Sequence, residues 1–268
     1  MTNKIKLYDT HAHPNLEPLL NCLDEILSES NENELFFNVV GVDLESSEKA
    51  IEIAQRASER VKACIAIHPN DVQKFDFNQA KSELNNMCEN YIDVISAIGE
   101  CGLDFYYTKE FTDIQYQFLD MHVELANKFN LPLMLHVRNA HNEMVEYIKK
   151  KKIDNPIIFH CFSENREIAK KILEIADSQT IYFSIPGIIT FKNATALQEA
   201  ISEIPLEKMV VETDSPWLAP MPYRGKMNRP IYVKHTVEKI AEIKNTDYKK
   251  VAEMTFNNAM NLFRKTNR

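Results

Sequence analysis

The chain has 268 residues and carries 39 acidic and 31 basic side chains, giving a formal net charge of −8. This balance argues against a protein that coats nucleic acid through clustered Lys and Arg, although a metal site with a local basic rim would still allow nucleic-acid processing. The length suits two small domains or one α/β barrel, which typically takes about 250 residues.

Apolar, β-rich segments alternate with amphipathic helical segments along the chain. The first strand, 5–7, leads into the motif Tyr8–His13, and seven more strands are predicted at 35–42, 61–67, 94–99, 132–135, 156–159, 180–185 and 208–211. Helices are predicted at 16–30, 48–60, 77–89, 111–129, 142–152, 165–176, 192–202, 232–243 and 248–264. Ser46 and Ser47 are expected to cap the second helix.

Eight strand-then-helix units in a chain of this length predict an α/β fold of the (β/α)8, or TIM-barrel, type in one domain, 1–268. A doubly wound open sheet is the alternative, but the chain lacks the Gly-rich first turn expected for that fold. The five cysteines form no CxxC pair, and the N-terminus has no apolar leader. We therefore expect reduced thiols, a cytoplasmic location and no membrane span.

Histidines and carboxylates follow six of the eight predicted strands, at the end where such a barrel carries its active site. They are His11 and His13, His68, Glu100, His136, His160 and Asp214. These residues are far apart in sequence but would converge in a closed barrel. Their convergence predicts a metal centre.

The His11-Ala12-His13 motif is the first part of this expected centre. Side chains two residues apart in a strand point to the same face, so both imidazoles are placed to share one ion. Asp9 would lie on that face and accept a hydrogen bond from a ring N–H.

Four imidazoles and two carboxylates are more ligands than one ion uses, so we expect two divalent cations that share Glu100. The two predicted ligand sets are His11, His13, Asp214 and Glu100, and Glu100, His136 and His160. Imidazole with carboxylate suits Zn²⁺, Mn²⁺, Ni²⁺ or Co²⁺, and Mg²⁺ fits at working concentrations. His68 has no place in either set.

Eight short motifs occur in this order: HAH, AIHP, GECGLDFYY, HVR, HCFS, FSIPGIITFKNA, VVETDSPWLAP and PYRGKMNRP. Together they closely resemble the signatures of the TatD family of metal-dependent hydrolases, often described as deoxyribonucleases. The resemblance covers nearly the whole chain and implies divalent-metal chemistry on DNA ends, with the same six ligands. Glu164 stands where the family commonly has Gly, so the resemblance leaves loop shape and substrate preference open.

The expected reaction is metal-assisted hydrolysis of a phosphodiester, with Glu100 and Asp214 as the catalytic carboxylates. Asp214 would bind metal and accept the proton of the attacking water, whereas a helix N-cap is its structural alternative. Glu212 is expected to support the ligands rather than join them. Cys101 and Cys161 are expected to serve packing alone.

Five further residues are candidates for substrate binding. They are His68, Arg138, Trp217, Arg224 and Arg229. The arginines would contact phosphates and the tryptophan would stack on a base. Each has a plain alternative: a structural histidine, surface ion pairs or solvated loop charges for the arginines, and packing under a loop for the tryptophan.

Three functions remain open from the sequence. The first is a TatD-type DNase, exonucleolytic and monomeric, with DNA as its transient partner and no stable protein partner. The second is an amide or ester hydrolase on the same site, such as an aminoacyl-tRNA deacylase, which the net charge of −8 favours. The third is a binding protein that has lost catalysis, but no presumed ligand is missing.

Overall fold

The computed structural model describes residues 4–263, and its centre is one parallel sheet of eight strands in sequence order. The strands are β1 (Leu7–Ala12), β2 (Leu35–Val40), β3 (Val61–Ile65), β4 (Ile95–Asp104), β5 (Leu133–Arg138), β6 (Ile157–Phe159), β7 (Ile181–Ile185) and β8 (Met209–Val211). A parallel bridge between Ala12 and Ser215 brings the chain beyond β8 back to β1. The predicted (β/α)8 barrel is confirmed.

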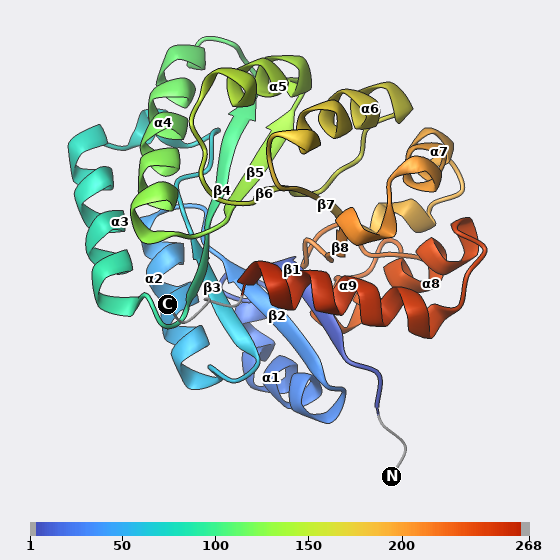
Figure 1. Ribbon diagram of the computed structural model, residues 1–268. Helices are drawn as coiled ribbons and strands as arrows, with labels where there is room; N and C mark the ends of the chain where they lie inside the picture. Colours follow the sequence, from blue (N-terminus) through green and yellow to red (C-terminus); the bar gives the residue numbers. More distant parts are fainter. Residues whose placement is uncertain (1–3, 264–268) are drawn as a thin grey trace.

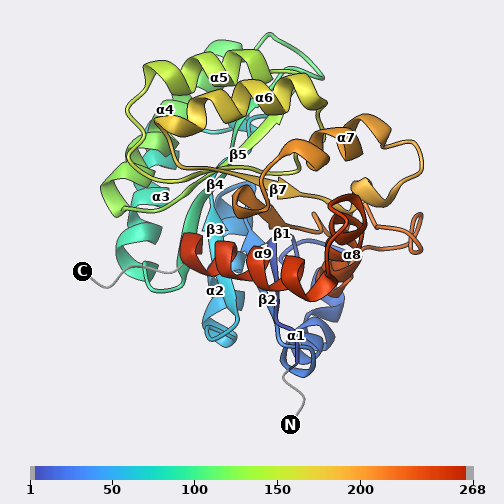
Figure 2. The same ribbon diagram turned by 45° about the vertical axis from the view of Figure 1, so that its right-hand side comes forward.

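Helices surround this barrel, and α9 crosses one of its ends (Figures 1 and 2). They are α1 (Leu23–Glu32), α2 (Leu44–Arg56), α3 (Phe77–Tyr91), α4 (Thr112–Phe129), α5 (His141–Lys150), α6 (Arg166–Glu174), α7 (Thr195–Glu203), α8 (Val233–Ile243) and α9 (Tyr248–Phe263). None of the helices within residues 4–263 combines the length and the apolar character needed to cross a bilayer.

The expected cap of α2 was wrong. The helix begins at Leu44, and Asp43 is its N-cap in an extended conformation. The Asp43 carboxylate accepts a hydrogen bond from the Ser46 backbone N–H at 2.7 Å, and the Ser46 hydroxyl accepts one from the Asp43 N–H at 3.0 Å. This reciprocal pair satisfies two backbone donors of the first turn, so Ser46 supports the cap from inside the helix.

The barrel interior has its own apolar core, separate from the layer between strands and helices. Its inward-facing strand residues include Tyr8 and Met134, and α9 contributes Leu262 and Phe263. The rings of Tyr8 and Phe263 stack with centroids 5.5 Å apart. Helix α9 therefore closes the end of the barrel where β1 begins, and the core forms a floor beneath the opposite end.

Two strands depart from regular register where they carry polar side chains. The pairing of β1 shifts between Asp9 and Ala12, and that of β4 shifts between Ile98 and Cys101. β4 also continues to Asp104, five residues beyond the predicted end, so Glu100 lies inside a strand. At these two register shifts, successive side chains therefore do not simply alternate between the two faces of the strand.

Gly102 allows β4 and β5 to approach closely. It pairs with His136 and has a φ of +147°. A Cβ at this position would lie 2.0 Å from the carbonyl oxygen of His136. Only glycine fits this backbone without displacing a candidate metal ligand.

Candidate metal centre

Glu100 lies at the centre of the predicted ligand set. Its Oε1 is 3.5 Å from the Nε2 atoms of both His11 and His13. Its Oε2 is 3.0 Å from the Nε2 of His160 and 3.3 Å from the Nδ1 of His136. One carboxylate thus faces two groups of imidazoles, with one oxygen directed at each.

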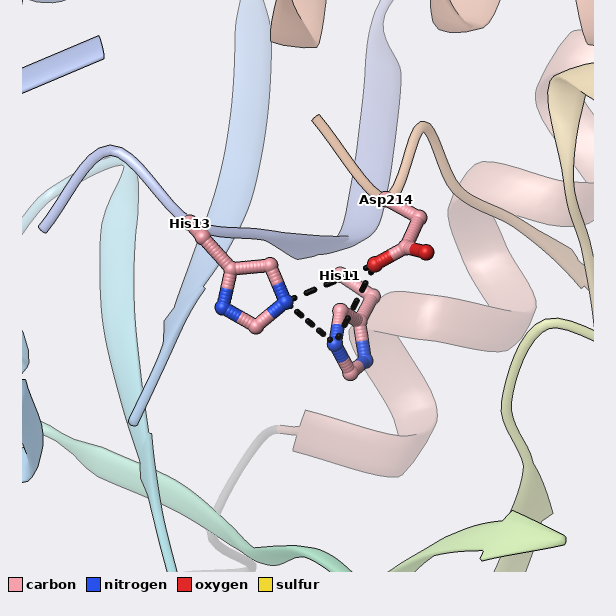
Figure 3. A group of neighbouring side chains, drawn as sticks. All are labelled: His11, His13 and Asp214. Atoms are coloured by element: carbon pink, nitrogen blue, oxygen red, sulfur yellow. Dashed lines mark hydrogen bonds and ion pairs between the residues drawn. The ribbon is translucent and has the colours of Figure 1, made fainter. Parts of the chain in front are cut away.

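The first group brings together the start of the chain and the segment after β8 (Figure 3). The Nε2 atoms of His11 and His13 are 3.1 Å apart, and the Asp214 Oδ1 lies 3.4 Å from that of His13. Asp214 has a φ of +54°, and its N–H donates to the His11 carbonyl at 2.9 Å. It lies in a turn far ahead of α8, so the helix N-cap alternative is wrong.

His68 lies next to the second group. His68, Glu100 and His136 offer ligand atoms within 4.8 Å of one another, as do His11, Glu100 and His160. The His68 Nε2 is 3.9 Å from the Glu100 Oε2. Burial, together with the neighbouring His136, lowers the pKa of His68 to about 4, so this imidazole is neutral and able to bind a cation. The structure therefore places His68 beside the ligands.

These groups perturb one another strongly. Burial alone would raise the pKa of Glu100, but the imidazoles of His160 and His11 outweigh it and hold the pKa well below its usual range. Burial alone would lower the pKa of His160, but Glu212 and Glu100 outweigh it and raise the pKa well above its usual range. Such opposed shifts in a small polar cluster are typical of functional sites.

The donor set fits divalent cations. Imidazole nitrogens and carboxylate oxygens are the ligands that first-row transition metals accept. Two ring nitrogens 3.1 Å apart, as in His11 and His13, would oppose their lone pairs unless a proton or a cation is shared between them. Burial of these two rings strengthens the argument, because buried polar groups require a partner.

Asp104 is a supporting residue that the sequence analysis missed. Its Oδ2 accepts hydrogen bonds from the His136 Nε2 at 3.1 Å and from the Asn70 amide at 2.9 Å. Its Oδ1 accepts one from the Tyr106 N–H at 2.9 Å. Asp104 therefore fixes the ring of His136 with Nδ1 directed at Glu100. The sequence feature that could have identified Asp104 is its position four residues after Glu100, at the end of the same strand.

Replacing Asp104 with Asn should weaken cation binding about 10- to 100-fold, because outer partners of metal-bound histidines typically contribute that much. The measurement is a titration of metal-free protein in competition with a chelating dye. Asn70→Ala is the control, since it removes a hydrogen bond from the same oxygen and leaves the charge in place. Equal affinities for wild type and Asp104→Asn would contradict an orienting role.

Asp9 does not hold a ring N–H as expected, because β1 is irregular at that point. The His13 Nδ1 instead donates to the Val40 carbonyl at 2.9 Å. The Asp9 carboxylate accepts hydrogen bonds from the Thr213 N–H at 2.8 Å and from the Thr213 hydroxyl at 2.5 Å. Asp9 thereby ties β1 to the turn that carries Asp214.

Glu212 has the supporting position that was expected for it. It accepts hydrogen bonds from the Ser184 hydroxyl and the Cys161 N–H, and its Oε1 lies 3.4 Å from the His160 Nδ1. Cys101 is fully buried in the outer core.

The remaining substrate-binding candidates have different surroundings. Trp217 is 49% exposed, and its ring meets that of His13 edge-on with centroids 5.1 Å apart. Arg229 forms ion pairs with Glu25 and Glu29 of α1 at 3.0 and 3.2 Å. Arg229 therefore joins the loop after β8 to α1, and its charge is already neutralised.

A barrel that gathers imidazoles and carboxylates at the carboxyl ends of its strands has the architecture and ligand chemistry that metal-dependent hydrolases use. The family model described as "TatD related DNase" matches residues 8–264. The chain is a member of this TatD family.

Individual relatives agree with this assignment. An uncharacterised metal-dependent hydrolase of Mycoplasma genitalium is 45% identical over 97% of this chain and 99% of its own length. Another from Bacillus subtilis is 34% identical over 96% of this chain and 99% of its own length. A crystal structure of the Escherichia coli TatD homologue YjjV matches with a TM-score of 0.88 at 22% identity, covering 97% of this chain and 98% of that one.

Proposed function

We propose that this hydrolase cleaves phosphodiester bonds of DNA with two divalent cations bound at Glu100. The main support for this proposal is that the two carboxylate oxygens of Glu100 face different groups of imidazoles. A shared carboxylate between two cation positions is the arrangement that two-metal phosphoryl chemistry uses. The family description supports DNA as the substrate. Attack at strand ends is part of the proposal.

His11, His13 and Asp214 would hold one cation, and His136 and His160 the other. When bound, the cations supply Lewis acidity and positive charge for the phosphate. Activity with each cation in turn would identify which of Zn²⁺, Mn²⁺, Mg²⁺, Ni²⁺ and Co²⁺ supports the reaction.

Asp214 is our choice for the group that accepts a proton from the attacking water. Its side chain is 16% exposed, whereas that of Glu100 is 6% exposed. A carboxylate that touches both solvent and the ligand cluster can receive a proton and release it to bulk water. Glu100, more deeply buried, holds the ligand groups in place.

The test is digestion of end-labelled single- and double-stranded DNA by metal-stripped protein that is re-supplied with each cation in turn. We expect stepwise shortening that requires a cation and is absent from Asp214→Asn protein prepared in parallel. That parallel preparation controls for contaminating nuclease. Intact DNA, with cations still bound, would overturn the DNase proposal and favour ester or amide substrates such as aminoacyl-tRNA.

A further inference from the structure

The arginines of this protein fall into two groups. Six of them lie in residues 4–263, and four form ion pairs with carboxylates: Arg56 with Asp24, Arg60 with Glu34, Arg166 with Glu203, and Arg229 with Glu25 and Glu29. Arg138 and Arg224 have no such partner among the described residues. Each lies over an aromatic ring, as the ion-paired Arg60 also does, and both belong to the end of the barrel that carries the metal centre.

Arg138 is the last residue of β5, two positions after His136. Its guanidinium carbon lies 3.6 Å from the centroid of the Tyr106 ring and 5.4 Å from that of Tyr107. The Tyr106 N–H donates to Asp104, which also holds the ring of His136. Tyr106, on which Arg138 stacks, is therefore hydrogen-bonded to the same carboxylate that orients the candidate ligand His136.

Arg224 lies in the loop after β8, which projects from the barrel (Figure 2). Its guanidinium carbon is 4.4 Å from the centroid of the Phe191 ring, in the segment after β7. The Met221 N–H donates to the Thr190 hydroxyl at 2.8 Å, which joins these two loops. Arg224 thus has an aromatic support supplied by a neighbouring strand–helix connection.

We propose that Arg138 and Arg224 are two phosphate-binding arms on different sides of the metal centre, positioned by Tyr106 and Phe191. A guanidinium that stacks on a ring keeps its N–H edge free to bind a phosphate, and stacking reduces the rotamer entropy lost on binding. Strand order separates the two supports, since Tyr106 follows β4 and Phe191 follows β7.

The proposal rests on the proposed function and narrows its substrate. A polyanion long enough to reach both arms is an oligonucleotide, whereas a small phosphodiester would engage the metal centre alone. The two arms should therefore affect substrates according to length. We expect the KM for a dodecanucleotide to depend on both arginines and the KM for bis(p-nitrophenyl) phosphate to depend on neither.

The first measurement is the steady-state kinetics of both substrates with Arg138→Ala, Arg224→Ala and the double variant. Each single change should raise KM for the dodecanucleotide about tenfold, with kcat nearly unchanged, since one charge-assisted hydrogen bond is worth that much. The double variant should show about a hundredfold change, because separate sites add. The logarithmic salt slope for single-stranded DNA should flatten by about 0.7 for each arm removed.

Matched control variants distinguish the loss of a phosphate contact from a general loss of positive charge and from structural damage. Arg166→Ala removes the same charge from an ion-paired arginine and should leave KM unchanged. Tyr106→Phe and Phe191→Tyr keep a ring beneath each arginine and should preserve KM, whereas Tyr106→Leu and Phe191→Leu should raise it. Effects of Arg138→Ala and Arg224→Ala no larger than that of Arg166→Ala would overturn the proposal.

Binding of the labelled dodecanucleotide, followed by fluorescence anisotropy in the metal-loaded protein, separates the two proposals. If wild type binds DNA through both arginines but cleaves none, the arms stand and the nuclease proposal fails. If wild type cleaves DNA with KM and anisotropy unchanged in the double variant, the nuclease proposal stands and the arms fail.

Discussion

Replacing Glu100 with Gln should lower kcat at least about a thousandfold, because in the proposed function Glu100 is the ligand that both cations would share. The amide keeps the size of the side chain but removes the charge that His11 and His160 face. Cation content measured by elemental analysis should fall with activity. The rise in melting temperature that a bound cation produces in wild type should disappear.

Glu124→Gln is the matched control for this variant. Glu124 is a surface residue of α4 that pairs with Lys81, so the same change of charge occurs away from the metal centre. It should leave kcat, cation content and melting temperature unchanged. A Glu100→Gln protein that retains two cations and normal kcat would show that Glu100 is not the bridging ligand.

Replacing Gly102 with Ala should destabilise the protein by about 3–5 kcal/mol and reduce cation binding. The new methyl group would meet the His136 carbonyl oxygen, so β5 must shift, and the backbone conformation adds strain of its own. Urea unfolding of the metal-free protein measures the stability change. Chelator competition measures the loss of affinity.

The variant Gly225→Ala separates the steric contact from the backbone strain. Gly225 also has a positive φ, of +84°, but a Cβ there has open space around it. Only the conformational cost of about 1 kcal/mol should appear, with cation affinity unchanged. If Gly102→Ala were no more harmful than Gly225→Ala, the close approach of β4 to β5 would not constrain the site.

The barrel was predictable because its periodic signals are local. Each buried strand is a short apolar run, and each helix repeats apolar residues at helical spacing. Closure of eight such units then places strand-end residues together, so the gathering of His11, Glu100 and Asp214 followed from topology alone.

The features that were not predicted from the sequence depend on partners that are distant along the chain. The register shifts of β1 and β4 arise in the ladders with neighbouring strands, so alternation misplaced Asp9. Arg229 was predicted to contact phosphate, with a solvated loop charge as the alternative, and the sequence did not reveal that Glu25 and Glu29 of α1 pair with it. The role of Asp104 depends on the ring of His136, which belongs to another strand.

The hydrogen bond between Asp9 and Thr213 joins residues 204 positions apart, and it holds the turn that carries Asp214 against the strand that carries His11. The other candidate ligands all precede Asp214 in the chain, and Asp214 belongs to the turn after the last strand. Contacts of such large sequence separation form late, because their loop-closure entropy must be offset first. Cation capture and closure of the last strand are therefore linked: a bound cation would stabilise the completed barrel, and a chain whose last strand is not yet in place offers an incomplete set of ligands.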